Sequence, residues 1–189
     1  CNTLVDMYIK CEHFLEAENM LDELSIKDLL SWTMLIVGYV KKGYGEQALT
    51  CFWQMQEEGV LPDMVSFICI LKVCTIIGSA EEGKRIHCQV IIDGLLEKEI
   101  IVGNTLVDMY ARCGALIKAQ EVFRGLPVQD IVSWNILIAG YVQHGYDEEA
   151  LSFFQEMQLV GHCPDIITFL SVIKACGKLG TLCKGEIIH

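Results

Sequence analysis

Cysteine and histidine have the greatest chemical capacity in this chain, because both ligate metals and cysteine also forms disulfides. The sequence has 10 cysteines and 5 histidines, yet it contains no C-x-x-C pair and no histidine followed by x-Glu. Four cysteines, at positions Cys51, Cys74, Cys88 and Cys176, lie within apolar helical patterns. Free cysteine in such a position behaves as a small hydrophobe. The sequence therefore predicts reduced core cysteines, and neither a disulfide framework nor a metal site.

The other possible catalytic signals are weak. Gly43, Gly45 and Ala48 match the dinucleotide-binding pattern G-x-G-x-x-A, but no strand precedes them and they fall in a predicted helix–helix turn. His87 and His189 lie on apolar helix faces without another ligand at metal-binding spacing, which indicates packing. We therefore expect no enzymatic activity and no cofactor.

A long internal repeat organises the chain. The segment Asn2–Tyr8 recurs word for word at Asn104–Tyr110, a shift of 102 residues. The same shift takes Trp32 to Trp134, and it holds over long stretches without a gap. Acidic residues at the break points divide this period into shorter repeats, of which the first and last are incomplete. The predicted repeats are 1–28, 29–63, 64–99, 100–130, 131–165 and 166–189.

Each repeat has the pattern of two helices. In repeat 29–63, Ser31 is the expected N-cap of the first helix, Gly43 begins the turn, and Gly59 ends the second helix. In repeat 64–99, Ser79 and Glu82 predict a capping box before the second helix. One such hairpin cannot bury its apolar face alone. The sequence therefore predicts an all-α solenoid of stacked helix-turn-helix repeats, with the first helices lining a concave face.

The composition is that of a folded, acidic protein. Hydrophobic residues make up 52% of the sequence and only 3 residues are proline, and no apolar run approaches the roughly 18 residues of a membrane span. The chain begins at Cys1 without a methionine or a leader, so we expect an internal piece of a longer protein. The net charge of −11 argues against a protein that holds nucleic acid by bulk electrostatics.

The motifs of the repeats resemble those of a known family. Ser133-Trp134-Asn135, Gly140-Tyr141-Val142 and Pro164-Asp165 resemble a 35-residue pentatricopeptide repeat. The alternation of 35, 36 and 31 residues resembles the PLS subfamily of land plants. The resemblance implies a right-handed superhelix that binds single-stranded RNA, and not DNA, in mitochondria or chloroplasts. It also implies a transcript that is targeted for C-to-U editing or other processing.

The resemblance further implies that one repeat faces one base, which is read by the fifth and the last residue of that repeat. These residues pair as Asn2 with Asp28, Thr33 with Asp63, Ile68 with Glu99, Asn104 with Asp130, and Asn135 with Asp165. Asn and Thr both donate and accept hydrogen bonds, whereas an ionised Asp only accepts and can orient them. The implied code reads Asn with Asp as uracil and Thr with Asp as guanine, and Ile68 and Leu170 leave their repeats blind. The expected RNA core is 5'-UGNUU-3', and local helix capping is the alternative role of these residues.

Aliphatic residues hold the second position of five repeats. In the family such residues sandwich the bases, and packing between repeats is the alternative. They are Leu30, Val65, Ile101, Val132 and Ile167.

Basic residues recur late in the first helix of four repeats. On a concave face they could contact phosphates, and complementing helix C-termini is the alternative. They are Lys10, Lys41, Arg112 and Lys178. Most acidic residues fall on second helices, which are expected to face outward, so the salt dependence of RNA binding is expected to be shallow.

Two function classes remain open. In the family, such arrays often precede a zinc-dependent cytidine deaminase domain or a domain that recruits one, and this chain lacks its H-x-E and C-x-x-C motifs. The first class is thus an RNA-recognition module whose partners are RNA-editing factors or a deaminase domain. The second is a helical-repeat scaffold for protein–protein interaction, which the acidic charge favours.

Overall fold

The computed structural model describes residues 2–22 and 28–180, and every regular element in these ranges is an α-helix. The side chain of Asn2 and residue His189 lie outside the described part of the chain. The elements are α1 (Asn2–Lys10), α2 (Phe14–Asp22), α3 (Leu29–Lys42), α4 (Gly45–Glu57), α5 (Met64–Ile77), α6 (Ala80–Ile92), α7 (Leu95–Lys98), α8 (Ile100–Arg112), α9 (Leu116–Gly125), α10 (Ile131–Gln143), α11 (Asp147–Leu159) and α12 (Ile166–Lys178). The all-α prediction is confirmed. The helices form two compact units, here called the N-terminal unit (1–90) and the C-terminal unit (91–189).

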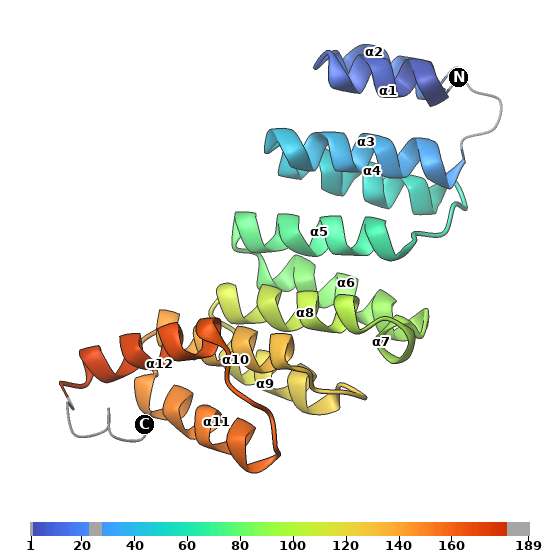
Figure 1. The fold of residues 1–189 in the computed structure, drawn as a ribbon. Helices are drawn as coiled ribbons and strands as arrows, with labels where there is room; N and C mark the ends of the chain where they lie inside the picture. The colour runs from blue at the N-terminus through green and yellow to red at the C-terminus, as the bar shows by residue number, and fades with distance from the viewer. Residues whose placement is uncertain (1, 23–27, 181–189) are drawn as a thin grey trace. The chain divides into compact units, whose positions relative to one another are not determined.

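In the N-terminal unit the first helices of successive repeats pack side by side. Helix α3 contacts both α1 and α5, while α2 and α4 lie in a second layer (Figure 1). Helix α2 contacts α1 and α3, and α4 contacts α3 and α5. This stagger covers the open faces of the α1–α2 and α3–α4 hairpins with the hairpin that follows, as a solenoid requires.

The C-terminal unit repeats this arrangement. Helix α10 contacts α8 and α12 in one layer, α9 packs on α8 and α10, and α11 packs on α10 and α12 (Figure 1). Arg124 of α9 forms a bidentate pair with Glu156 of α11, which ties the two second-layer helices together. The short helix α7 is an additional element of repeat 64–99 that the two-helix pattern does not predict, and it packs on α8.

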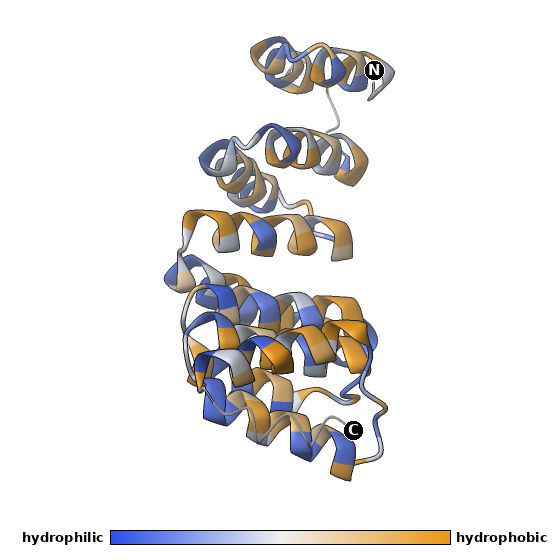
Figure 2. Cartoon of the chain, turned by 60° about the vertical axis from the view of Figure 1, so that its left-hand side comes forward, coloured by the Kyte–Doolittle hydropathy of each residue, from blue (hydrophilic) through white to orange (hydrophobic). Residues whose placement is uncertain are grey.

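Helix α5 shows how the apolar pattern produces the core. It is coloured hydrophobic along most of its length in Figure 2, and Phe67, Ile70 and Leu71 are fully buried at helical spacing. Burial of each of these side chains against α3 and α4 stabilises the fold by about 1.5–3 kcal/mol, because it removes apolar surface from water. Ile76, on the opposite side near the end of the helix, remains 69% exposed.

Aspartates, and not the predicted serine, are the N-cap residues of the first helices α3, α5, α10 and α12. The Asp28 side chain accepts from the Ser31 backbone N–H (2.9 Å) and the Ser31 hydroxyl (2.6 Å), so the prediction of Ser31 as N-cap was wrong. An ionised carboxylate at this position also interacts favourably with the helix dipole. The same cap recurs one, three and four repeats further on, at Asp63 of α5, Asp130 of α10 and Asp165 of α12, whereas Glu99 before α8 makes no side-chain cap.

The predicted capping box of α6 forms only in part. The Ser79 hydroxyl accepts from the Glu82 backbone N–H at 3.2 Å. The reciprocal bond is missing from the described contacts because the Ser79 N–H already donates to the carbonyl of Cys74 and the Glu82 carboxylate pairs with Arg85.

No disulfide joins the cysteines of the described ranges. Cys51 and Cys74 are buried, as predicted, and burial raises the pKa of the Cys51 thiol to about 12. Cys88 is exposed, so its assignment to the core was wrong. It lies two residues from both Ile86 and Val90, which face the core of α6, and a two-residue step turns a helix to its other side. Cys176 is half-buried.

Two glycines explain how closely the first helices approach. At Gly140 of α10 an added Cβ would lie 2.7 Å from the Cβ of Ala111 in α8. At Gly38 of α3 it would lie 2.5 Å from Cγ2 of Ile9 in α1. Only glycine therefore fits where these helices cross, which explains the recurring glycine of the Gly-Tyr-Val motif.

The substitution Gly140→Ala is expected to destabilise the protein by up to about 2 kcal/mol. Overpacking costs about 1–3 kcal/mol, because the Cβ of Ala111 cannot move without its backbone, and the gain in helix propensity of about 1 kcal/mol offsets only part of it. The matched control is Gly177→Ala in α12, where no described atom lies within 4 Å of the added Cβ. This control is expected to stabilise by about 0.5–1 kcal/mol. Urea unfolding measures both, and equal effects would contradict the close approach.

Candidate nucleic-acid interface

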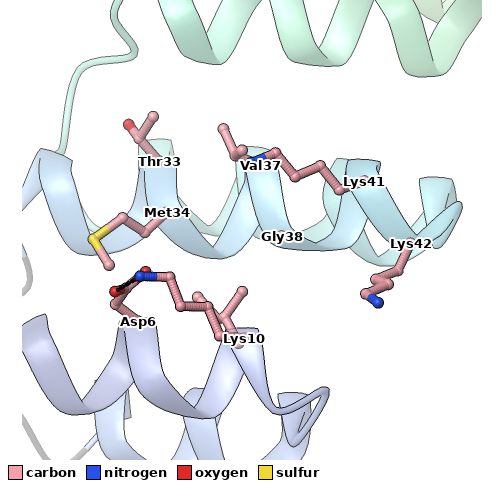
Figure 3. Close-up of a pocket in the computed structure, with 9 residues that line it drawn as sticks. Asp6, Lys10, Thr33, Met34, Val37, Gly38, Lys41 and Lys42 are labelled. Carbon is pink, nitrogen blue, oxygen red and sulfur yellow. Dashed lines mark hydrogen bonds and ion pairs between the residues drawn. The ribbon is translucent and has the colours of Figure 1, made fainter.

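A groove of about 410 Å³ runs along α1 and α3 in the N-terminal unit. Figure 3 shows Thr33 pointing from α3 towards α5, and Met34 pointing towards α1, where Asp6 and Lys10 form an ion pair. The groove thus contains the predicted reading residue Thr33 and two of the predicted phosphate contacts, Lys10 and Lys41.

The C-terminal unit has the equivalent groove, with a volume of about 260 Å³. Eight of the nine lining positions of the first groove recur here after a shift of 102 residues, with Asn135 in place of Thr33 and Arg112 in place of Lys10. Val132, Asp165 and Ile167 complete the lining. The structure therefore brings together residues predicted as a reading pair, two of the aliphatics predicted to sandwich bases, and a basic residue, in one groove of the C-terminal unit.

Asn135 is held firmly in this groove. Its amide Nδ2 donates to both carboxylate oxygens of Asp165, at 3.0 Å each, and its Oδ1 accepts from the Thr168 hydroxyl at 2.6 Å. The side chain is only 6% exposed. A carboxylate accepts but does not donate, so Asp165 fixes which end of the amide faces it. One Nδ2 hydrogen and one Oδ1 lone pair remain for a ligand.

Hydrogen bonds also keep Asp165 ionised. The backbone N–H and the hydroxyl of Thr168, and then the amide of Asn135, hold the pKa of the Asp165 carboxyl below its ordinary value. The carboxylate therefore remains an acceptor throughout the neutral pH range.

Asn104 makes the corresponding contact in the preceding repeat, but not in the same way. Its Nδ2 donates to Asp130 Oδ1 at 3.2 Å, whereas its Oδ1 is buried without a partner among the described residues. The hydroxyl of Ser133, which occupies the position of Thr168, donates instead to the carbonyl of Asp130 at 2.8 Å. The two Asn–Asp pairs thus differ in the third group that completes them.

Thr33 reaches its predicted partner through an intermediate. The Thr33 hydroxyl lies 3.1 Å from the hydroxyl of Ser66, and Ser66 in turn donates to Asp63 Oδ1 at 2.7 Å. Of the residues predicted to leave their repeats blind, Ile68 of α5 is half-buried and Leu170 of α12 is 64% exposed.

The predicted base-sandwiching aliphatics are all exposed. Val65 is the least exposed, at 41%, and Ile167 the most, at 58%. Leu30, Ile101 and Val132 fall between these values. Packing between repeats therefore covers only part of each side chain, and the remaining surface is open to a ligand.

The four predicted phosphate contacts differ in what they bind within the protein. Lys10 pairs with Asp6 at 2.6 Å and Arg112 pairs with Asp108 at 2.7 Å. Both pairs are solvent-exposed, so each contributes little to stability and leaves the cation accessible. Lys178 Nζ donates to the carbonyl of Val142 at 2.7 Å, near the C-terminal end of α10, which is the alternative role of these residues. Lys41 has no carboxylate partner in the described ranges.

Sequence reasoning did not identify the hydroxyl residues of the site. Ser31, Ser66, Ser133 and Thr168 all hold the third position of their repeats, directly after the sandwiching aliphatic. Their recurrence was the available signal, and the assignment of Ser31 to helix capping concealed it.

No three His, Cys, Asp or Glu side chains of residues 2–22 and 28–180 come together in a metal-binding geometry. Within the same ranges, no helix combines the length and the apolar character that crossing a bilayer demands.

Helix pairs that stack in two layers, with one groove recurring at the repeat period, define an α-helical repeat protein. The profile of the PPR repeat family matches residues 27–75 and 129–178, together more than half of the chain. The profile of the single PPR repeat matches residues 1–29 and 104–129. The chain belongs to the PPR repeat family.

Curated relatives resemble the chain along its whole length. It is 36% identical to the mitochondrial pentatricopeptide repeat-containing protein At4g19191 of Arabidopsis thaliana, over 100% of this chain and 29% of that protein. It is 34% identical to the chloroplastic pentatricopeptide repeat-containing protein At4g18520 of the same plant, over 99% of this chain and 30% of that protein. The chain thus spans about a third of the length of these relatives.

Solved structures show the same fold. PPR10 from maize in complex with an 18-nt psaJ RNA element matches with a TM-score of 0.73 and 22% identity, over 97% of this chain and 28% of that chain. The PPR domain of Arabidopsis thaliana protein-only RNase P 1 in complex with tRNA matches with a TM-score of 0.66 and 15% identity, over 92% of this chain and 95% of that chain. Both matches extend over nearly the whole chain, which supports the solenoid class predicted from the sequence.

Proposed function

We propose that this chain is a sequence-specific, single-stranded RNA-binding module that reads one base with each repeat. The observation that carries the proposal is the recurrence of one groove in both units, each time with a reading residue and a basic side chain. PPR proteins of the same fold occur in complexes with an RNA element and with tRNA, which supports RNA as the ligand class.

The chemistry of the groove suits an unpaired base. Exposed aliphatics such as Val132 and Ile167 offer apolar surface to the two faces of a base, and the remaining donor and acceptor of Asn135 meet its edge. Duplex nucleic acid hides that edge in base pairing, so single strands are the ligand. In repeat order the reading residues select the core 5'-UGNUU-3'.

The biological setting follows from the same proposal. The predicted repeat lengths of 35, 36 and 31 residues support membership of the PLS subfamily. The chain spans about a third of the length of its relatives, which supports a longer repeat array. Relatives named mitochondrial and chloroplastic support an organellar transcript as the target. The chain supplies recognition and does not deaminate, and C-to-U editing or other processing is carried by another domain or by a recruited editing factor.

The substitution Val132→Asp tests the RNA-binding face. A carboxylate there replaces apolar surface by a charge that repels phosphates, so affinity for 5'-UGNUU-3' is expected to fall at least about tenfold. The matched control is Val160→Asp, because Val160 is also exposed, at 59%, but lies at the end of the second-layer helix α11. Fluorescence anisotropy at low salt is expected to show less than a twofold change for the control. Equal losses in both variants would place RNA elsewhere.

A protein-binding scaffold is the second candidate, and one observation favours it. A groove of about 550 Å³ lies between the start of α9 and the α10–α11 turn, where Ile117 and Tyr146 are exposed at 76% and 50%. This groove does not include the reading residues. Two results together would support the scaffold over RNA recognition. The native protein would bind no RNA, and the substitution Tyr146→Ala would abolish its binding to a partner protein.

A further inference from the structure

We infer that Ser66 and Thr168 are positioning residues that determine base specificity in the preceding repeat, as a third position beside its fifth and last residues. The inference rests on the proposed function. Both side chains are fully buried and bridge to the reading residue of the repeat before them, 33 residues earlier in each case. They are too buried to touch RNA themselves, so they act by orienting Thr33 and Asn135.

The direction of the hydrogen bonds around Ser66 follows from proton counting. The Asp63 carboxylate can only accept, so the Ser66 hydroxyl donates its single hydrogen to Asp63 Oδ1. The 3.1 Å contact between the two hydroxyls then requires Thr33 to donate and Ser66 to accept. With its hydrogen committed, Thr33 presents only lone pairs to the groove. Asp63 makes no described contact with Thr33, so Ser66 is the group that transmits this constraint.

An acceptor at Thr33 distinguishes between the two purines. The Watson–Crick edge of guanine carries two adjacent donors, at N1 and N2, whereas adenine has an acceptor at N1 and its donor at N6. A Thr33 hydroxyl that cannot donate therefore favours guanine and rejects the adenine N1. A free hydroxyl could rotate and satisfy either base. The relay through Ser66 thus gives a physical reason for the guanine preference of a Thr–Asp pair.

Thr168 completes Asn135 in a related way. The Thr168 hydroxyl accepts from the Asp165 backbone N–H at 3.1 Å, and two acceptors lie near its hydrogen, Asn135 Oδ1 at 2.6 Å and Asp165 Oδ1 at 3.0 Å. Asn135 Oδ1 only accepts, so the shorter contact requires the Thr168 hydrogen to point mainly towards it. The amide is then held at both ends, with its donor and acceptor in a fixed order. Uracil and cytosine present opposite donor–acceptor orders at positions 3 and 4, so a fixed amide distinguishes them and a mobile one does not.

Asn104 provides the internal comparison. It has the same Asp partner, but the Ser133 hydroxyl is turned to the Asp130 carbonyl and leaves Asn104 Oδ1 without a partner among the described residues. Two repeats with identical reading pairs are therefore expected to differ in specificity. The repeat of Asn135 discriminates uracil from cytosine more strongly than the repeat of Asn104.

The substitution Ser66→Ala tests the relay, with fluorescence anisotropy on 5'-UGNUU-3' and 5'-UANUU-3' as the readout. The native chain is expected to prefer guanine by about tenfold, within the discrimination that one good base contact supplies. Ser66→Ala is expected to reduce the ratio of the two affinities to within about threefold, mainly by improved adenine binding. Ser66→Thr keeps the hydroxyl and is expected to restore the ratio, as Thr168 shows that threonine fits the equivalent position. A purely structural role would lower both affinities and leave their ratio unchanged.

Thr168→Val gives a second test that does not depend on how Ser66→Ala folds. It is expected to lower the preference for 5'-UGNUU-3' over 5'-UGNUC-3' by about threefold to fivefold, and to leave the preference over 5'-UGNCU-3', which Asn104 reads, unchanged. Native specificity that persists in both Ser66→Ala and Thr168→Val would overturn the inference while the proposed function stands. A native chain that binds no RNA, or binds all of these RNAs alike, would overturn both.

Discussion

Replacing Trp134 by alanine is expected to lower the free energy of unfolding of the C-terminal unit by about 3–5 kcal/mol, the largest stability effect that the structure predicts. The indole is 1% exposed, and its ring centroid lies 4.7 Å from that of Phe123 with the planes at 71°. The pair joins α9 of one repeat to α10 of the next. The substitution therefore opens a cavity at the junction between repeats and also removes an edge-to-face contact.

Urea unfolding followed by far-UV circular dichroism measures this effect without relying on tryptophan fluorescence. The control is Tyr146→Ala, because Tyr146 is also aromatic but 50% exposed, and its loss is expected to cost less than about 1 kcal/mol. A Trp134→Ala loss as small as that of the control would show that the junction between α9 and α10 is not a packed core.

The fold could be predicted from the sequence because the apolar pattern and the repeat period agree with each other. The apolar stripes also predict four aromatic core residues, and Trp32, Phe67 and Trp134 are at most 1% exposed, which confirms them. Phe169, at the equivalent position of α12, is only half-buried, so its assignment to the core was wrong. Cys88 shows the limit of the same reasoning. Two residues along a helix are enough to move a side chain from the buried side to solvent.

Local competition between polar groups accounts for what the sequence did not predict correctly. Ser31 and Asp28 are both good N-cap residues, and three residues separate them. The structure gives the cap to the carboxylate and turns the hydroxyl towards it. Residue preferences alone do not rank two neighbouring acceptors, because the choice depends on where the preceding loop places each side chain.

The candidate site was predictable in its positions but not in its connections. Recurrence in the sequence predicts Asn104 and Asn135 as reading residues, and the structure brings each to its Asp partner. The hydroxyls that complete them belong to the next repeat, so their contacts depend on how repeats stack. The hydroxyls of Ser133 and Thr168 donate to different partners, and the sequence pattern does not indicate this difference.

Exchange of the reading residue Thr33 has the largest expected effect on function. Thr33→Asn places an amide beside Asp63 and Ser66, a carboxylate and a hydroxyl at the positions that Asp165 and Thr168 hold around Asn135. The base preference of repeat 29–63 is therefore expected to change from guanine to uracil. Because each preference corresponds to about 1–3 kcal/mol, the ratio of affinities for the two RNAs is expected to change by at least about 30-fold.

The measurement is fluorescence anisotropy at low salt of 5'-UGNUU-3' and 5'-UUNUU-3', with the native chain, Thr33→Asn and the control Thr50→Asn. Thr50 is an exposed threonine of the second-layer helix α4, away from the groove. The account predicts that the native chain and Thr50→Asn prefer the guanine RNA, and that Thr33→Asn prefers the uracil RNA. An unchanged preference in Thr33→Asn, or a native chain that binds both RNAs alike, would contradict recognition of one base by each repeat.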